Sequence, residues 1–206
     1  EHQLGITEQT PLPSRHVNEY AATKRQAEQL VRDYPGSWTI LRPRAVFGPG
    51  DTVLLPRIIH AARQGRLPVL YAPDGPVVGD LIYIDNLVDA IQAAAEKRVT
   101  GLFNLTNNEP VPILEFLFSV FDQLGIPRPT RRVSATTAMA MAGMLEGFHR
   151  LFLPWSEPAI TRFGVHVFRY SKTFDVTKSM QILGPPSVPL DKGLKLTVEW
   201  FRTAAA

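Results

Sequence analysis

A helix that leads, after a very short turn, into an apolar strand is the feature that most restricts the fold of this chain. Residues 17–34 are rich in the helix formers Glu, Ala, Lys, Arg, Gln and Leu, and Pro35-Gly36 ends the helix. Residues 37–42 then read Ser-Trp-Thr-Ile-Leu-Arg, the composition of a buried strand. Because a helix that returns directly to a strand is typical of a parallel sheet, we predict an α/β fold.

Apolar periodicity and turn residues predict the remaining elements. Residues 101–106 form a second buried strand. Shorter strands are expected at 68–71, 81–84 and 172–174, and helices at 54–64, 87–96, 113–124, 135–152, 176–183 and 190–202. Residues 1–16 are polar and contain proline, which predicts a loop in which Ser14 can cap the following helix. Asp85-Asn86 is expected to cap the helix 87–96.

Composition excludes several classes of protein. The 206 residues are 45% hydrophobic and 20% charged, which is typical of a globular chain. The absence of cysteine excludes disulfides, thiolate zinc and a cysteine nucleophile, and the five scattered histidines predict no metal site. A net charge of +3 does not indicate a nucleic-acid partner. Without a spanning apolar run or a signal peptide, we expect a cytoplasmic protein, soluble or peripheral to a membrane.

Tyr20 and Lys24 are the sharpest chemical signal. A spacing of four residues places both side chains on one face of a helix, one turn apart. A free phenol, with a pKa near ~10, is a poor proton shuttle at neutral pH. A cation held nearby favours the phenolate and makes a tyrosine usable as a general acid or base. Taken alone, the pair is better explained by two exposed side chains on a helix surface.

Further motifs follow in a fixed order. They are Leu-Arg-Pro-Arg-Ala-Val-Phe-Gly-Pro-Gly-Asp at 41–51, Tyr-Ile-Asp-Asn-Leu-Val-Asp-Ala at 83–90 and Phe-Asn-Leu-Thr at 103–106. Together with Tyr20, Lys24 and Glu28, this set resembles the extended short-chain dehydrogenase/reductases over most of the chain. Residues 171–176, followed by Leu183-Gly184, are similar to the 3-beta-hydroxysteroid dehydrogenase-like branch.

The resemblance implies the C-terminal part of a Rossmann-type, doubly wound parallel sheet and a smaller, mostly helical substrate-binding lobe. Residues 1–66 would be the latter part of the dinucleotide-binding domain and would carry the Tyr/Lys helix. Residues 67–206 would mostly form the substrate-binding lobe, with the strand 102–106 returning to the Rossmann sheet.

The resemblance also implies an NAD(P)-dependent oxidoreductase that interconverts a secondary alcohol and a ketone. Tyr20 would be the catalytic acid/base, and Lys24 would bind the nicotinamide ribose and tune the tyrosine. The cofactor, with NAD favoured over NADP, is expected to contact Tyr20, Lys24, Pro43, Ala45 and Val46. The substrate is expected to contact Phe47, Asp51, Gly79 and Met144.

The chain departs from the family pattern before Tyr20. The family's glycine-rich turn, which holds the pyrophosphate at a helix N-terminus, has no match here, and Gly48-Pro49-Gly50 has the wrong continuation. The family's catalytic Ser or Thr would fall upstream of Glu1, and Thr7, Thr10 and Ser14 are interpreted as loop or cap residues. We therefore expect the C-terminal part of a longer enzyme, inactive as an isolated fragment. The exposed strand edges of such a fragment predict a homo-oligomer.

The residue at position 79, a glycine, indicates the chemical class of the substrate. Nucleotide-sugar members of the superfamily usually have a phosphate-binding arginine just before the stretch that here begins Asp80-Leu81-Ile82-Tyr83. Glycine at this position favours an apolar substrate, steroid-like or long-chain. Two alternatives stay open: a nucleotide-sugar epimerase or dehydratase that uses the same tyrosine, and a truncated, non-catalytic binding module.

Residues 135–152 are rich in methionine, phenylalanine and leucine. Methionine adapts to irregular apolar space, so this helix could line a substrate pocket as well as form the core of the second lobe. A peripheral membrane contact is the third interpretation, although the polar face is not strongly basic. The basic cluster Arg128, Arg131 and Arg132 is interpreted as a solvated loop.

Overall fold

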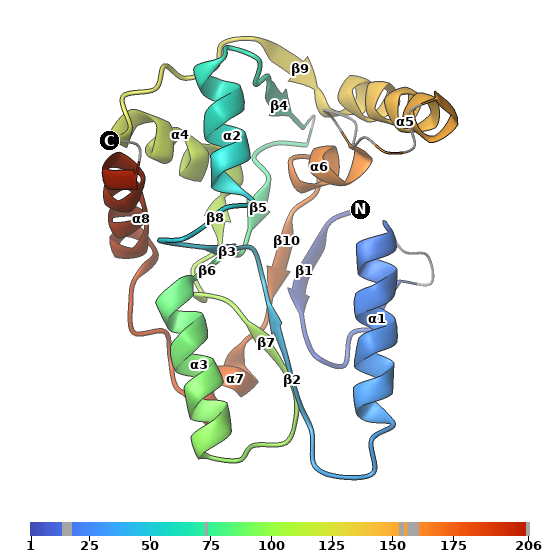
Figure 1. The fold of residues 1–206 in the computed structure, drawn as a ribbon, viewed down its shortest axis with the longest axis vertical. Coiled ribbons are helices and arrows are strands. Elements are labelled where there is room, and N and C mark those ends of the chain that lie inside the picture. Colours follow the sequence, from blue (N-terminus) through green and yellow to red (C-terminus); the bar gives the residue numbers. More distant parts are fainter. Residues whose placement is uncertain (14–17, 73, 153–154, 156–160, 205–206) are drawn as a thin grey trace. The chain divides into compact units, whose positions relative to one another are not determined.

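The computed structural model describes residues 1–13, 18–72, 74–152, 155 and 161–204 (Figure 1). The chain divides into two compact units, which are described separately. Unit 1 comprises residues 1–3, 52–79 and 111–172, and unit 2 comprises residues 4–51, 80–110 and 173–206. Each unit is therefore assembled from segments that lie far apart in the sequence.

Two parallel strand pairs form the centre of unit 2. Strand β2 (Thr39–Pro43) pairs with β7 (Gly101–Leu105), with Thr39 opposite Gly101 and Pro43 opposite Leu105. Strand β3 (Val46–Phe47) pairs with β6 (Ile82–Tyr83). Residues 102–105 are buried, whereas residues 39–42 are half-buried. The predicted parallel arrangement and the α/β fold class are confirmed.

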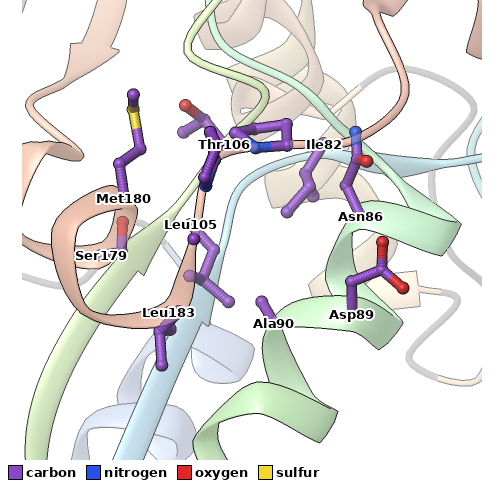
Figure 2. A pocket seen from close by; sticks show the side chains of 12 residues that line it. Ile82, Asn86, Asp89, Ala90, Leu105, Thr106, Ser179, Met180 and Leu183 are labelled. Carbon is purple, nitrogen blue, oxygen red and sulfur yellow. The ribbon is translucent and has the colours of Figure 1, made fainter.

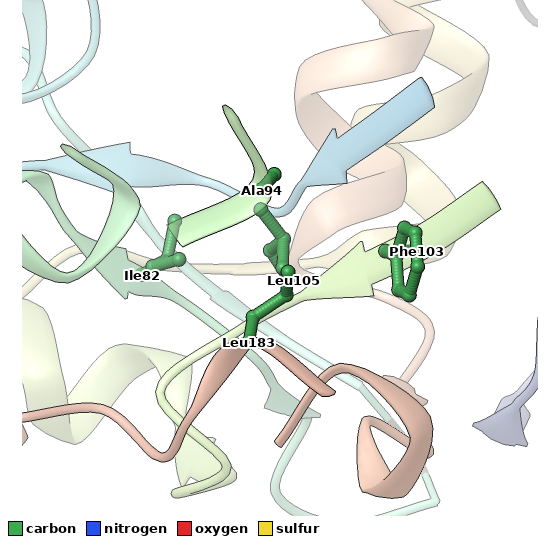
Figure 3. Packing of buried hydrophobic residues seen from close by; sticks show 5 residues of the cluster. All are labelled: Ile82, Ala94, Phe103, Leu105 and Leu183. Carbon is green, nitrogen blue, oxygen red and sulfur yellow. The ribbon is translucent and has the colours of Figure 1, made fainter. Parts of the chain in front are cut away.

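Helices cover β7 with apolar side chains. Buried Ile82, Ala94, Phe103, Leu105 and Leu183 form one cluster, which joins β6, β7, α3 (Ile84–Glu96) and α7 (Thr177–Leu183) (Figure 3). Full burial of one such large side chain contributes about 1.5–3 kcal/mol, so this cluster fixes the sheet against α3 and α7. Helices α1 (Glu19–Arg32) and α8 (Leu190–Ala204) complete the unit.

The first and tenth strands meet beside this sheet. They are β1 (Gln3–Ile6) and β10 (Lys172–Phe174). In unit 2, the Gly5 amide donates to Thr173 Oγ1 at 3.0 Å, and the Asp175 amide donates to the Ile6 carbonyl at 2.9 Å. Strand β1 and strand β10, whose residues Gly5 and Thr173 are 168 positions apart in the sequence, thus share hydrogen bonds.

The described residues of unit 1 form short strands and four helices. Its helices are α2 (Leu55–Arg63), α4 (Ile113–Gln123), α5 (Ala135–Phe152) and α6 (Arg162–Val167). Its strands are β4 (Val69–Tyr71), β5 (Val78–Gly79), β8 (Val111–Pro112) and β9 (Arg132–Ser134). β4 runs parallel to β9, and β5 runs antiparallel to β8. Gly79 of β5 also pairs with Lys172 at the start of β10, in parallel.

Two local predictions are wrong. Residues 3–6 form β1 rather than a loop, because the partner groups of this strand come from distant residues 171–175. Helix α3 begins at Ile84, so Asp85 and Asn86 lie inside its first turn and do not cap it. The cap of α1 is Asn18, whose Oδ1 accepts from the Ala21 amide at 2.8 Å. The predicted cap Ser14 lies outside the described residues.

Candidate active site

Helix α1 brings Tyr20 and Lys24 together on its exposed surface. The Lys24 Nζ atom lies 5.5 Å from the centroid of the Tyr20 ring. Tyr20 is 67% exposed, and Lys24 is also exposed. The spacing therefore does place a cation beside the ring of an accessible tyrosine.

Glu28 connects helix α1 to strand β2 through hydrogen bonds with Arg42. Its carboxylate accepts from Arg42 of β2, at 2.9 Å from Nε to Oε2 and 2.5 Å from NH2 to Oε1, and from Arg32 at 2.8 Å. A two-point contact between a guanidinium and a carboxylate fixes orientation as well as distance. Because Glu28 follows Lys24 by one helical turn, this contact sets where α1 carries Tyr20 and Lys24 relative to β2. The order of motifs in the sequence includes Glu28 but does not predict this contact.

Glu28 makes the stability of unit 2 depend on pH. Burial alone would raise the pKa of Glu28, but the hydrogen bonds and charges of Arg42 and then Arg32 outweigh it and hold the pKa below its ordinary 4.5. A carboxylate with a lowered folded-state pKa adds stability above its ordinary pKa, and this stability is lost as the pH falls through the folded-state value.

We therefore expect Glu28→Gln to be less stable than the parent protein near neutral pH, with a difference that shrinks once the pH falls below 4.5. Urea unfolding at a series of pH values measures this difference. The control is the double variant Glu28→Gln/Arg42→Gln, which should follow the pH profile of the single variant. A difference that stays constant from pH 7 to pH 3 would contradict the assignment.

The predicted cofactor contacts Pro43, Ala45 and Val46 lie where the chain passes from β2 to β3. Pro43 ends the pairing with β7, and Val46 begins the pairing with Ile82 of β6. Between them, Ala45 has a φ of 44°, in the left-handed region that a residue with a side chain rarely adopts. The Ala45 carbonyl accepts from the Ile82 amide at 3.3 Å. This backbone is therefore held in one conformation by neighbours on both sides.

The sequence did not predict a pair of opposite charges at this crossing, half-buried Arg44 and buried Asp80. Asp80 is 2% exposed, and its Oδ2 accepts from the Phe174 amide at 2.7 Å. The guanidinium carbon of Arg44 lies 6.0 Å from the centroid of the Phe174 ring. Burial lowers the pKa of Arg44 and raises that of Asp80, and the attraction between the two charges opposes both shifts. Within the described part of the chain, neither Arg44 Nε nor Asp80 Oδ1 has a hydrogen-bond partner.

The four predicted substrate residues are divided equally between the units. In unit 2, Phe47 is only 1% exposed and packs on Tyr83, at 5.6 Å between ring centroids, and the Asp51 amide donates to the Gly48 carbonyl. In unit 1, Gly79 is buried, whereas Met144 is 69% exposed. Phe47 is thus a packing residue within its unit, and Met144 is accessible within its own.

The end of the Ile113 side chain lies close to the Cα atom of Gly79. A Cβ atom there would lie 2.8 Å from Ile113 Cδ1 and 3.2 Å from Ile113 Cγ1. The backbone of Gly79 pairs with strands on both sides, at Val111 and Lys172. A larger residue at this position would require the end of the Ile113 side chain to move.

A small cavity in unit 2 lies apart from these residues (Figure 2). It has a volume of about 40 Å³ and is lined by residues of β6, α3, β7 and α7 and of the segment 184–186. Its polar side chains are bonded within the protein: Asn86 Nδ2 donates to Asn107 Oδ1, and Asp89 Oδ2 accepts from Ser187. Substrate pockets have volumes of roughly 300–1,000 Å³, so this cavity is a packing space with room for a few waters.

Two other kinds of feature are absent from the described residues. No group of three or more His, Asp or Glu side chains in this part of the chain is arranged to hold a metal ion. Among the same residues, no helix combines the length and the apolar character needed to cross a bilayer.

Comparison with known proteins identifies the family. The model of the NAD dependent epimerase/dehydratase family matches residues 1–105, which include the Tyr/Lys helix, the crossing at 43–46 and β7. The chain belongs to the NAD dependent epimerase/dehydratase family. The resemblance to extended short-chain dehydrogenase/reductases is thereby confirmed.

Two curated members of this superfamily illustrate the similarity. The chain is 31% identical to 3beta-hydroxysteroid-dehydrogenase/decarboxylase isoform 1 of Arabidopsis thaliana, over 96% of the chain and 49% of that protein. It is 33% identical to 2-alkyl-3-oxoalkanoate reductase of Shewanella oneidensis, over 95% of the chain and 54% of that protein. The chain thus spans about half the length of these relatives.

Solved structures of the epimerase/dehydratase fold confirm the architecture. UDP-glucuronic acid 4-epimerase from Bacillus cereus, in complex with NAD, superposes with a TM-score of 0.67 at 19% identity. The match covers 100% of the chain and 58% of the epimerase. The similarity establishes that the chain shares this α/β fold.

Proposed function

We propose that the protein is an NAD-dependent oxidoreductase that interconverts a secondary alcohol and a ketone on an apolar substrate, in the manner of 3-beta-hydroxysteroid dehydrogenases. The observation that carries this proposal is the accessible Tyr20–Lys24 pair on α1, in a chain of an NAD-dependent family. The names of two relatives, a 3beta-hydroxysteroid-dehydrogenase/decarboxylase and a 2-alkyl-3-oxoalkanoate reductase, support the same class of reaction.

Tyr20 would move the proton. The chemistry that NAD supplies when bound is hydride transfer at the substrate carbon. During oxidation the Tyr20 phenolate would accept the hydroxyl proton of the substrate, and during reduction the Tyr20 phenol would donate a proton to the carbonyl oxygen. The Lys24 ammonium lies 5.5 Å from the ring centroid, so a cation stands beside the group that would exchange the proton.

The residues of unit 2 fit a nicotinamide riboside. Lys24 is exposed and carries three donors, which suit the vicinal hydroxyls of a ribose. The backbone of Pro43, Ala45 and Val46 is fixed between β7 and β6, so it could present a constant surface to a planar ring. NAD is proposed ahead of NADP because the family description and the solved relative both name NAD.

The apolar substrate class rests on Gly79. A phosphate of a nucleotide sugar, if buried without a charged partner, is costly, and Gly79 supplies no charge at the position where nucleotide-sugar members usually have an arginine. A nucleotide-sugar epimerase or dehydratase that uses the same tyrosine, and a non-catalytic binding module, are the competing functions.

A substrate panel tests the proposal. The intact protein would be assayed with NAD(H) and NADP(H) against hydrophobic ketones and secondary alcohols, both steroid-like and long-chain, and against UDP- and dTDP-sugars. We expect kcat/KM for the best apolar substrate to exceed that for any nucleotide sugar by about 10²-fold or more. Turnover of nucleotide sugars alone would favour the epimerase or dehydratase. Cofactor binding with no turnover of any compound would favour the binding module.

A further inference from the structure

Helix α1 carries Tyr20 and Lys24, yet none of its residues is buried within the described part of the chain. All of them are exposed except three, which are half-buried: Ala21, Ala22 and Glu28. Helices in proteins are usually stabilised mainly by the burial of an apolar face. The two alanines offer little apolar surface, so Glu28 is the one long side chain of α1 that its surroundings partly cover.

The hydrogen bonds of α1 show where the helix is attached. Apart from Glu28, its described hydrogen-bonding side chains reach residues of the helix itself or the flanking residues Pro13 and Asp33. The Glu28 carboxylate accepts two hydrogen bonds from Arg42 of β2. Among the described residues, this two-point contact is therefore the hydrogen-bonded link between α1 and the sheet.

The Glu28–Arg42 contact is more covered than an ordinary surface ion pair. The two side chains are 14% and 22% exposed. Exposed ion pairs contribute little because water and salt compete with them. Coverage reduces that competition, and two parallel hydrogen bonds fix the orientation of both groups. The contact can therefore hold a helix that has no apolar attachment of its own.

Backbone pairing fixes the strand end of this contact. Arg42 lies in the ladder between β2 and β7, where the following Pro43 pairs with Leu105. The Arg44 amide donates to the Leu105 carbonyl at 3.0 Å, which continues the pairing beyond β2. The crossing 43–46, which is the proposed nicotinamide surface, thus begins immediately after the residue that holds α1.

The contact joins the two parts of the proposed site. Glu28 follows Lys24 by about one helical turn and Tyr20 by about two. Arg42 precedes the crossing 43–46. Proton transfer by Tyr20 and hydride transfer at the nicotinamide act on an oxygen and a carbon that are one bond apart. A misplacement of about 1 Å between such groups can lower the rate about 10²-fold.

We propose that Glu28 and Arg42 are positioning residues, whose contact holds Tyr20 and Lys24 in a fixed place relative to the crossing 43–46. They act through α1 and β2 and not on the substrate itself. This inference rests on the proposed oxidoreductase function, because it concerns the alignment of the same acid/base with the same cofactor. It goes beyond the stability effect of Glu28, since it predicts a lower rate in protein that stays folded.

Hydrogen exchange tests the attachment of α1 without any substrate. Arg42→Gln removes the two-point donor, but Arg32 still donates to Glu28 at 2.8 Å, so the carboxylate keeps a partner. We expect amide exchange in residues 19–32 of the intact protein to become about tenfold faster or more, with exchange in α3 unchanged. The matched control is Arg32→Gln. It removes a donor to the same carboxylate but none to β2, and it should change exchange little.

Steady-state kinetics on the best substrate of the panel test the consequence for the reaction. With saturating NAD, kcat of Arg42→Gln should fall about 10- to 100-fold. The Kd for NAD should change less than about threefold, since an exposed lysine still reaches a ribose after a small shift of its helix. Glu28→Gln/Arg42→Gln should have the kcat of Arg42→Gln alone, because either change breaks the same contact. Arg32→Gln should keep parental kcat.

Circular dichroism would show that the variants are folded. If Arg42→Gln does not fold, Arg42→Lys replaces it with the same expected directions, because lysine keeps the charge but cannot form two parallel hydrogen bonds. Unchanged exchange in α1, parental kcat in Arg42→Gln, or losses of kcat that multiply in the double variant would each overturn the proposal. A parent protein that turns over no compound of the panel would contradict the proposed function, and exchange would still decide whether the contact holds α1.

Discussion

Replacing Tyr20 by phenylalanine is expected to lower kcat about 10²–10⁴-fold, the range that a positioned acid or base supplies. The change removes one oxygen atom and leaves the ring beside Lys24, where the ammonium lies 5.5 Å from the ring centroid. Because the Tyr20 side chain is 67% exposed, loss of its hydroxyl leaves no buried group unpaired. The affinity for NAD should therefore stay close to that of the parent protein.

Steady-state kinetics on the best substrate of the panel, with calorimetric titration of NAD, measures both quantities. Tyr34→Phe is the matched control, since Tyr34 lies just after the same helix and is 60% exposed. This control should retain parental kcat. If Tyr20→Phe also retained it, the phenol would not be the acid/base and the proposed mechanism would be wrong.

The elements predicted best are those whose signal is local. Helices α4 and α5 were predicted at 113–124 and 135–152 and occur at Ile113–Gln123 and Ala135–Phe152. The parallel strands β2 and β7 were likewise anticipated from short apolar runs that follow helices. In these segments propensity, periodicity and turn residues indicate the same structure, so no tertiary contact has to override them.

The elements that were missed depend on distant partners. Strands β3, β5 and β8 have two residues each, which is too short for an alternating pattern to be visible. Strand β1 is polar and contains a glycine, and it exists because residues 171–175 offer hydrogen bonds to it. Short apolar or mixed segments of this kind carry no period that could distinguish strand from loop.

The candidate site also contains some residues with a local sequence signal and others whose contacts depend on distant parts of the chain. Tyr20 and Lys24 were found because a helix converts a spacing of four residues into proximity. Two other interactions join residues that are distant in the sequence: Glu28 with Arg42, and Arg44 with Asp80. Spacing along the chain therefore cannot predict them. The side of α5 that faces the core was equally hidden, since Met144 and Phe148 are exposed although they are more apolar than the buried Ala142.

Lys24→Ala is expected to impair both binding and turnover, unlike Tyr20→Phe. Loss of a charged hydrogen-bond donor costs about 1.5–3 kcal/mol, so the Kd for NAD should rise roughly 10- to 100-fold. Turnover should fall as well, by about 10²-fold, because the cation beside the Tyr20 ring and the proposed contact to the ribose are both gone. Kd from calorimetry and kcat at saturating cofactor separate the two effects.

Arg25→Ala is the matched control for Lys24. Arg25 is the neighbouring cation on α1, but it donates from NH1 to the Pro13 carbonyl at 2.9 Å and so is directed to another part of the chain. Its removal changes the net charge by the same amount as Lys24→Ala, and we expect Kd and kcat to stay within about threefold of the parent, since a solvent-exposed charge contributes little. Equal losses in the two variants would mean that general electrostatic attraction of the cofactor accounts for the effect. If Kd and kcat change only in Lys24→Ala, the Lys24 ammonium acts both on cofactor binding and on proton transfer. This result would support its proposed position at the ribose and beside the Tyr20 phenol.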